Sequence, residues 1–109
     1  MRTFDVRARI EDSGEYVLGL EDTGSHACYL IYGIMKPYEK GRELKPGAGH
    51  EELFLAMKGD FVVTGHSEVM LREGQAMHLI GDQTCWLENT SASEAIYVIS
   101  GGHSDTGHD

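Results

Sequence analysis

Four side chains in the middle of the chain have the chemistry of metal ligands. His50 and Glu52 are two residues apart, and His78 and Cys85 follow later in the sequence. Side chains of a strand point to the same face at every second residue, so His50 and Glu52 share a face if a strand begins by Gly49. Imidazole, carboxylate and thiolate groups are ligands of zinc and other first-row divalent metals. If the faces of these strands meet inside a barrel, the four groups converge on one site.

The elements that must position these side chains are predicted to be strands. The chain contains 14 glycines and only two prolines, and strand-like runs fill the gaps between the glycines. Turn signals at a spacing of roughly 8–12 residues are typical of an all-β sandwich or barrel. No window shows a convincing helical period, so no long helix is expected.

The sequence places these strands along most of the chain. Residues 3–10 alternate between apolar and polar side chains, which predicts a first strand with one buried face. From residue 52 onward, short runs separated by glycine turns predict a meander in which each strand pairs with the next. The further expected strands are 16–20, 26–35, a short one near 42–44, 52–58, 61–64, 68–71, 76–80, 84–89 and 95–100.

Length and charge limit the classes of protein and partner. A chain of 109 residues suits one domain, with a barrel over residues 1–101 and a polar, mobile tail over residues 102–109. The net charge of -9 argues against nucleic acid and anionic membrane surfaces as partners. No apolar signal segment or membrane span is evident, so a cytoplasmic location is expected. Cys28 and Cys85 are expected to be free thiols, with Cys28 buried in an apolar run.

The stretch from Pro46 to Asn89 resembles the cupin superfamily. Glu52 and Gly59 match the glutamate and glycine of the first cupin motif, and Gly74 and Asn89 match the two ends of the second. The resemblance implies a double-stranded β-helix, a jelly-roll barrel that encloses a polar pocket. It also implies a homodimer, since cupins often associate through their outer strands and an unpaired sheet edge needs cover.

The histidines of the usual cupin metal site are absent. Pro46 and Ala48 occupy the positions of the two histidines in the first motif, and Cys85 occupies the position of the third. We therefore consider a remodelled site in which His50, Glu52 and Cys85, with or without His78, bind zinc, iron, nickel or manganese. The alternative is structural, with His50 at the strand entrance, Glu52 hydrogen-bonded across the barrel and Cys85 a buried thiol.

Three functions remain open at this point. The first is a cupin whose barrel pocket binds an unidentified small molecule, with no specific reaction assignable. The second is a metal-dependent enzyme of the dioxygenase or isomerase kind that uses the non-standard site of His50, Glu52 and Cys85. The third is an interaction protein that uses only the barrel surface, which a sealed and apolar interior would favour.

Overall fold

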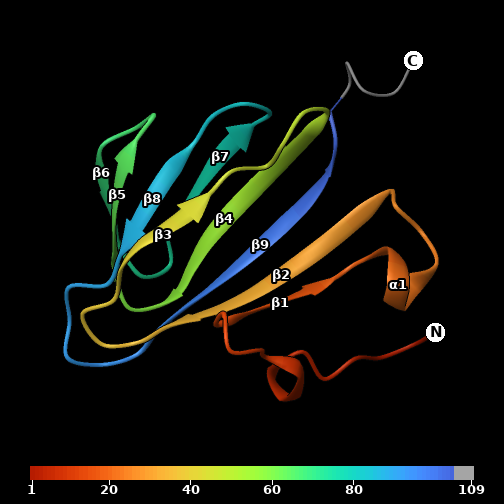
Figure 1. Ribbon diagram of the computed structural model, residues 1–109, viewed down its shortest axis with the longest axis horizontal. Coiled ribbons are helices and arrows are strands. Elements are labelled where there is room, and N and C mark those ends of the chain that lie inside the picture. The colour runs from red at the N-terminus through yellow and green to blue at the C-terminus, as the bar shows by residue number, and fades with distance from the viewer. Residues whose placement is uncertain (105–109) are drawn as a thin grey trace.

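Alternation of apolar and polar residues gives this chain strands that bury one face and expose the other. The computed structural model describes residues 1–104, in which two sheets face each other (Figure 1). A 3-10 helix, Arg7–Arg9, and a single-turn helix α1, Leu20–Thr23, are its helical elements. The strands are β1 (Glu15–Leu18), β2 (Cys28–Met35), β3 (Lys40–Leu44), β4 (His50–Lys58), β5 (Phe61–Gly65), β6 (Val69–Leu71), β7 (Ala76–Ile80), β8 (Cys85–Glu88) and β9 (Ala95–His103).

The strands are connected as in a jelly roll. The five-stranded sheet has the order β1-β2-β9-β4-β7, and the four-stranded sheet has the order β3-β8-β5-β6. All neighbours are antiparallel, and only β1–β2 and β5–β6 are neighbours in both space and sequence. The other connections cross between the sheets. The expected all-β jelly roll is therefore confirmed, whereas the expected meander from residue 52 onward is wrong.

The space between the sheets is filled by apolar side chains. Phe54, Phe61 and Tyr97 form its centre, with ring centroids 4.9 to 5.8 Å apart. Leucine, valine, isoleucine, methionine and alanine side chains from both sheets pack around these rings. Burial of this surface is the main stabilising contribution to the fold. The middle of the barrel is thus a packed core.

The first predicted strand, residues 3–10, is wrong. This segment runs along the β1 side of the five-stranded sheet and contains the 3-10 helix (Figure 1). Its contacts are made by side chains, since the guanidinium groups of Arg2 and Arg9 lie 5.1 and 5.6 Å from the Phe4 ring. Arg9 also donates to Tyr16 and Asp22. The segment is therefore joined to β1 and α1 through Arg9 and pairs with no strand of residues 1–104.

Two further expectations change at the ends of the five-stranded sheet. Strand β9 continues to His103, so residues 102 and 103 belong to the sheet and not to a tail. The rest of the expected tail, 105–109, lies outside the described residues. Cys28 is exposed, because it begins β2 opposite Gly102 on the outer face of the sheet.

None of the helices in residues 1–104 has the length and apolar character needed to cross a membrane.

Candidate functional site

Strand β4 carries polar groups into one end of the barrel. Phe54 lies in the core, and side chains alternate between the two faces along the strand. Glu52 and His50, two and four residues before Phe54, therefore lie on the same inner face, toward the N-terminal end of β4. Glu52 is only 4% exposed. On the adjacent β9, Gly101 lies opposite Glu52 and His103 lies opposite His50. The inner face thus changes from apolar to polar within a few residues.

Tyr29 reaches Glu52 across a glycine. Tyr29 of β2 lies opposite Gly101 of β9, which in turn lies opposite Glu52 of β4. A Cβ atom on Gly101 would be 2.2 Å from Cζ of Tyr29, so only glycine leaves room for the ring at this position. The Tyr29 hydroxyl crosses the gap and donates a hydrogen bond of 2.5 Å to Oε2 of Glu52.

The second carboxylate oxygen of Glu52 is unsatisfied. Oε1 is buried and has no hydrogen-bond partner among residues 1–104. Burial raises the pKa of Glu52 above its ordinary value, and the nearby Glu15 carboxylate raises it as well. The Tyr29 hydrogen bond and His50 lower this pKa but do not outweigh burial. Burial and the contact with Glu52 also raise the pKa of Tyr29. A buried acceptor without a donor is costly, and its occurrence in a native protein calls for an explanation.

Three histidines surround this end of the barrel. The rings of His50 and His103 have centroids 5.4 Å apart, and those of His103 and His26 are 5.2 Å apart. Nε2 of His103 lies 2.7 Å from the backbone oxygen of His26 and 3.1 Å from its Nδ1. The His50 ring meets Tyr29 edge to face at 5.8 Å. Together Tyr29, His26, His50 and His103 form an aromatic rim beside Glu52.

A second tyrosine crosses a glycine deeper in the same sheet. Tyr97 of β9 lies over Gly33 of β2, where a Cβ atom would be 2.1 Å from its Cζ, and donates a hydrogen bond to Glu15 of β1. Arg42 of β3 donates to the Tyr97 hydroxyl at 3.2 Å and to Glu39 at 2.7 Å. These contacts satisfy the polar groups of Tyr97 and Arg42 with protein partners.

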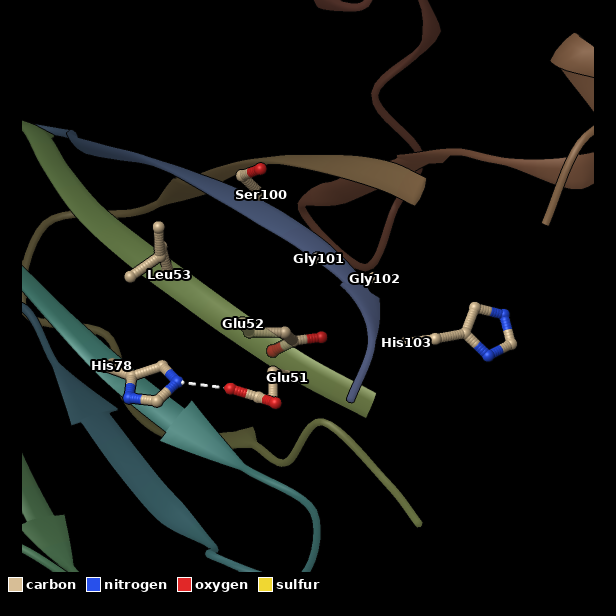
Figure 2. A pocket seen from close by; sticks show the side chains of 8 residues that line it. All are labelled: Glu51, Glu52, Leu53, His78, Ser100, Gly101, Gly102 and His103. Atoms are coloured by element: carbon tan, nitrogen blue, oxygen red, sulfur yellow. Dashed lines mark hydrogen bonds and ion pairs between the residues drawn. The ribbon is translucent and has the colours of Figure 1, made fainter. Parts of the chain in front are cut away.

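Two cavities border the rim. One, of about 320 Å³, lies mainly on the outer face of the five-stranded sheet, where it is lined by Glu51, Leu53, His78, Ser100 and Gly102, and it also reaches Glu52, Gly101 and His103 (Figure 2). The other, of about 260 Å³, is lined by His50 with Gly49, Glu51, residues 80–82 and Ser104. Space for a small ligand therefore lies next to Glu52 and the rim histidines, with the larger cavity mainly on the outer face of the sheet.

Comparison with solved structures identifies the architecture. An oxalate oxidase, 16% identical, matches 85% of this chain and 53% of its own with a TM-score of 0.69. A Thermotoga maritima protein described as a predicted oxalate decarboxylase, 15% identical, matches over 83% and 81% of the two chains with a TM-score of 0.67. A Schizosaccharomyces pombe cupin domain, 10% identical, matches over 73% and 58% with a TM-score of 0.64. The protein has the cupin fold.

The comparisons with sequences add nothing to this assignment. No protein-family model matches the chain, and no curated protein matches it in sequence. The solved structures compared above are 10 to 16% identical to this chain, so the similarity to them shows a shared fold and no more.

The four residues predicted from the sequence as metal ligands lie in three different parts of the structure. His50 and Glu52 lie together at the inner end of β4. Cys85 is 1% exposed and packs in the apolar core. His78 lies on the outer face, where its Nε2 is 2.8 Å from Oε1 of Glu51 (Figure 2). The structure therefore brings two of the four side chains together.

The four predicted donor groups are not assembled around one metal position in residues 1–104. Within the described part of the chain, no three His, Cys, Asp or Glu side chains are grouped so that they could hold one. Glu52 has Tyr29 as its polar partner, and Cys85 is surrounded by hydrocarbon. We therefore derive no chemistry through a bound metal.

Sequence reasoning missed Tyr29, His26 and His103 as members of the site. His103 could have been found by continuing the alternation of β9, because it shares a face with Tyr97, Ile99 and Gly101. Tyr29 and His26 carry no such signal. Their approach to Glu52 and His103 depends on the pairing of β2 with β9, strands about 70 residues apart in the sequence.

Proposed function

We propose that this cupin binds a small molecule at the polar end of its barrel, with Glu52 as the principal binding group. The observation that carries the proposal is the buried Oε1 atom of Glu52, which lacks a partner in residues 1–104. A ligand that supplies the missing hydrogen bond removes the cost of leaving this acceptor unsatisfied. Specificity in such sites comes from a few well-placed polar groups, and here those are Glu52, Tyr29 and the rim histidines.

The packed core sets the depth of the proposed site. Phe54 follows Glu52 on the inner face and is fully buried against other rings. A ligand therefore binds between Glu52 and the rim, not in the middle of the barrel. This arrangement favours a binding protein over a metal-dependent dioxygenase or isomerase, because within residues 1–104 the predicted ligands His50, Glu52 and Cys85 are not assembled around one position.

We also propose that the protein forms a dimer through the outer face of its five-stranded sheet, because apolar side chains are exposed there. Leu53, Leu55 and Met57 of β4 are exposed on the outer face of the five-stranded sheet, between the central strand β9 and the edge strand β7. Large apolar patches of this kind are typical of protein interfaces. The outer-facing residues of β4 and β9 include few charges in a protein of net charge -9, so repulsion between two copies that meet there is small.

The proposed ligand site is tested by nuclear magnetic resonance with isotope-labelled protein and a library of small polar fragments. Binders should move the backbone amide signals of Glu52, Gly101 and Tyr29. The effect should be lost in Glu52→Gln, which preserves the shape of the side chain, and kept in Glu43→Gln, which changes an exposed carboxylate of β3. Fragments that bind Glu52→Gln and the unmodified protein equally would remove Glu52 from the site and overturn the proposal.

A further inference from the structure

The charges around Glu52 restrict what can bind there. An ionised carboxylate accepts hydrogen bonds and cannot donate them. Glu15 is close enough to Glu52 to raise its pKa, so the inner face holds two mutually repelling acids. We infer that the ligand of this site is an organic cation, a small amine or guanidine whose N–H groups bind Oε1 of Glu52. This inference rests on the proposed function and names its ligand class.

The tyrosine hydroxyls and the arginine near Glu52 already have partners. The Tyr29 hydroxyl is bonded to Oε2 of Glu52, and the Tyr97 hydroxyl is bonded to Glu15. Arg42, which enters the interior from β3, donates to Tyr97 and Glu39. Neither a hydroxyl nor a guanidinium of this network is left for Oε1. Apart from His50, whose proximity lowers the pKa of Glu52, the complementary donor and positive charge must therefore come from the ligand.

The aromatic rim suits the rest of such a cation. Tyr29 and His50 meet edge to face at 5.8 Å, and His50 and His103 follow at 5.4 Å. Ring faces attract ammonium and guanidinium groups within about 6 Å of their centroids. The Tyr29 ring thus supplies a face for the charged head and its first carbon atoms, while Glu52 binds the N–H groups.

The electrostatic field of the whole protein also favours a cationic ligand. The net charge of -9 raises the local concentration of cations and disfavours approach by anions. Within the site, protonation of Glu52 competes with the ligand for Oε1. Binding of the cation should therefore strengthen as the pH rises and should release a proton where Glu52 is protonated in the free protein.

The experiment compares three probes of nearly equal size, propylamine, 1-propanol and propionate, together with methylguanidine. Each is titrated into labelled protein at mildly alkaline pH while the amide signals of Tyr29, Glu52 and Gly101 are followed. Propylamine and methylguanidine should shift these signals saturably, and the alcohol and propionate should not. Affinity for the amine should fall on the order of tenfold in Glu52→Gln. Glu43→Gln serves as the control for general electrostatics and should bind as the unmodified protein does.

The outcomes separate the inference from the function on which it rests. If 1-propanol or propionate moves the same signals in a Glu52-dependent way and the amines do not, the cation inference fails and the binding function stands. If zinc ions alone move these signals more strongly than the amines, the carboxylate belongs to a metal and the inference is overturned. If no probe and no fragment depends on Glu52, both proposals fail.

Discussion

The Tyr29 hydroxyl donates a 2.5 Å hydrogen bond to Glu52 across Gly101, a residue whose missing side chain leaves the space that the tyrosine ring occupies. The contact joins β2 to β4 over the intervening β9. It satisfies one oxygen of a buried carboxylate and leaves the other without a partner in residues 1–104. Local stability, the pKa of Glu52 and the proposed ligand binding therefore depend on Tyr29, Glu52 and Gly101.

Gly101→Ala should destabilise the protein by about 1–3 kcal/mol, the usual cost of overpacking. The added methyl group would be 2.2 Å from Cζ of Tyr29, so the ring must leave Glu52. Chemical denaturation measures the change. Gly19→Ala is the control, because φ there is -145° and the added atom would meet its neighbours at ordinary distances of 3.7 and 3.8 Å. Equal stability of the two variants would show that Tyr29 does not depend on the glycine.

Tyr29→Phe should raise the pKa of Glu52 further, because the Tyr29 hydrogen bond lowers that pKa in the folded protein. Loss of the donor leaves a buried carboxylate without a partner and should cost about 1–3 kcal/mol of the free energy of unfolding. Carbon-detected magnetic resonance of the Glu52 carboxyl follows the pKa directly. A pKa that stays the same or falls would contradict the role assigned to the hydroxyl.

The stability of the protein should carry a pH-dependent contribution from Glu52. Burial raises the pKa of Glu52 in the folded state, so this group's stabilisation is complete below the unfolded pKa of about 4.3 and is lost as the pH rises through the higher folded value. The free energy of unfolding of the unmodified protein, minus that of Glu52→Gln, should therefore decrease from about pH 4 to neutrality. Urea denaturation at a series of pH values tests this. A difference that increases with pH would reverse the sign of the effect.

Cys85→Ser should destabilise the protein without changing its metal content. Cys85 is 1% exposed and packs among apolar residues, so a serine hydroxyl there would be buried without a partner, at a cost of about 1–3 kcal/mol. Cys85→Ala, which adds no polar group, separates loss of volume from burial of the hydroxyl. Elemental analysis of untagged protein accompanies the denaturation curves. Stoichiometric metal that is lost in either variant would restore Cys85 as a ligand.

Leu53→Lys and Leu55→Lys should turn a dimer into a monomer. These residues are 54% and 38% exposed on the outer face of β4, and a charge there would be buried in the proposed interface. Light scattering coupled to size-exclusion chromatography gives the mass of each variant. Met70→Lys, at an exposed position of β6 in the other sheet, should remain a dimer. An unmodified protein of monomer mass at high concentration would refute the proposed interface.

Three of the four motif positions that predicted the fold, Gly59, Gly74 and Asn89, have structural roles in the folded chain. Gly59 and Gly74 have φ of +80° and +87°, which only glycine adopts freely, and they close turns at the ends of strands. The Asn89 amide is buried and donates to the backbone oxygens of Lys36 and Ser93. Turns and loop contacts of this kind are local and leave a mark in the sequence. This explains why these positions predicted a cupin and said little about a ligand.

The sequence predicted only the part of the site that lies on a single strand, β4. His50 and Glu52 share a face because they are two residues apart on β4, and the alternation gives this without a structure. His78 lies on the outer face because it is paired opposite Leu53. Cys85, on the four-stranded sheet, lies in the apolar core between the two sheets. Both positions depend on how the strands pair and how deeply each residue is buried. Tyr29 enters through β2–β9 pairing. Such long-range pairs have no signature in a single sequence.

The two tyrosine crossings have a consequence for how β9 is aligned with its neighbours. Tyr29 needs a glycine opposite it on β9, and Tyr97 of β9 needs a glycine opposite it on β2; Gly101 and Gly33 meet both needs at once. A slip of β9 by two residues keeps the inner and outer faces but places Ile99 or His103 beneath Tyr29, where no side chain fits. The glycines therefore fix the register of the central strand, a choice that hydrophobic alternation alone leaves open.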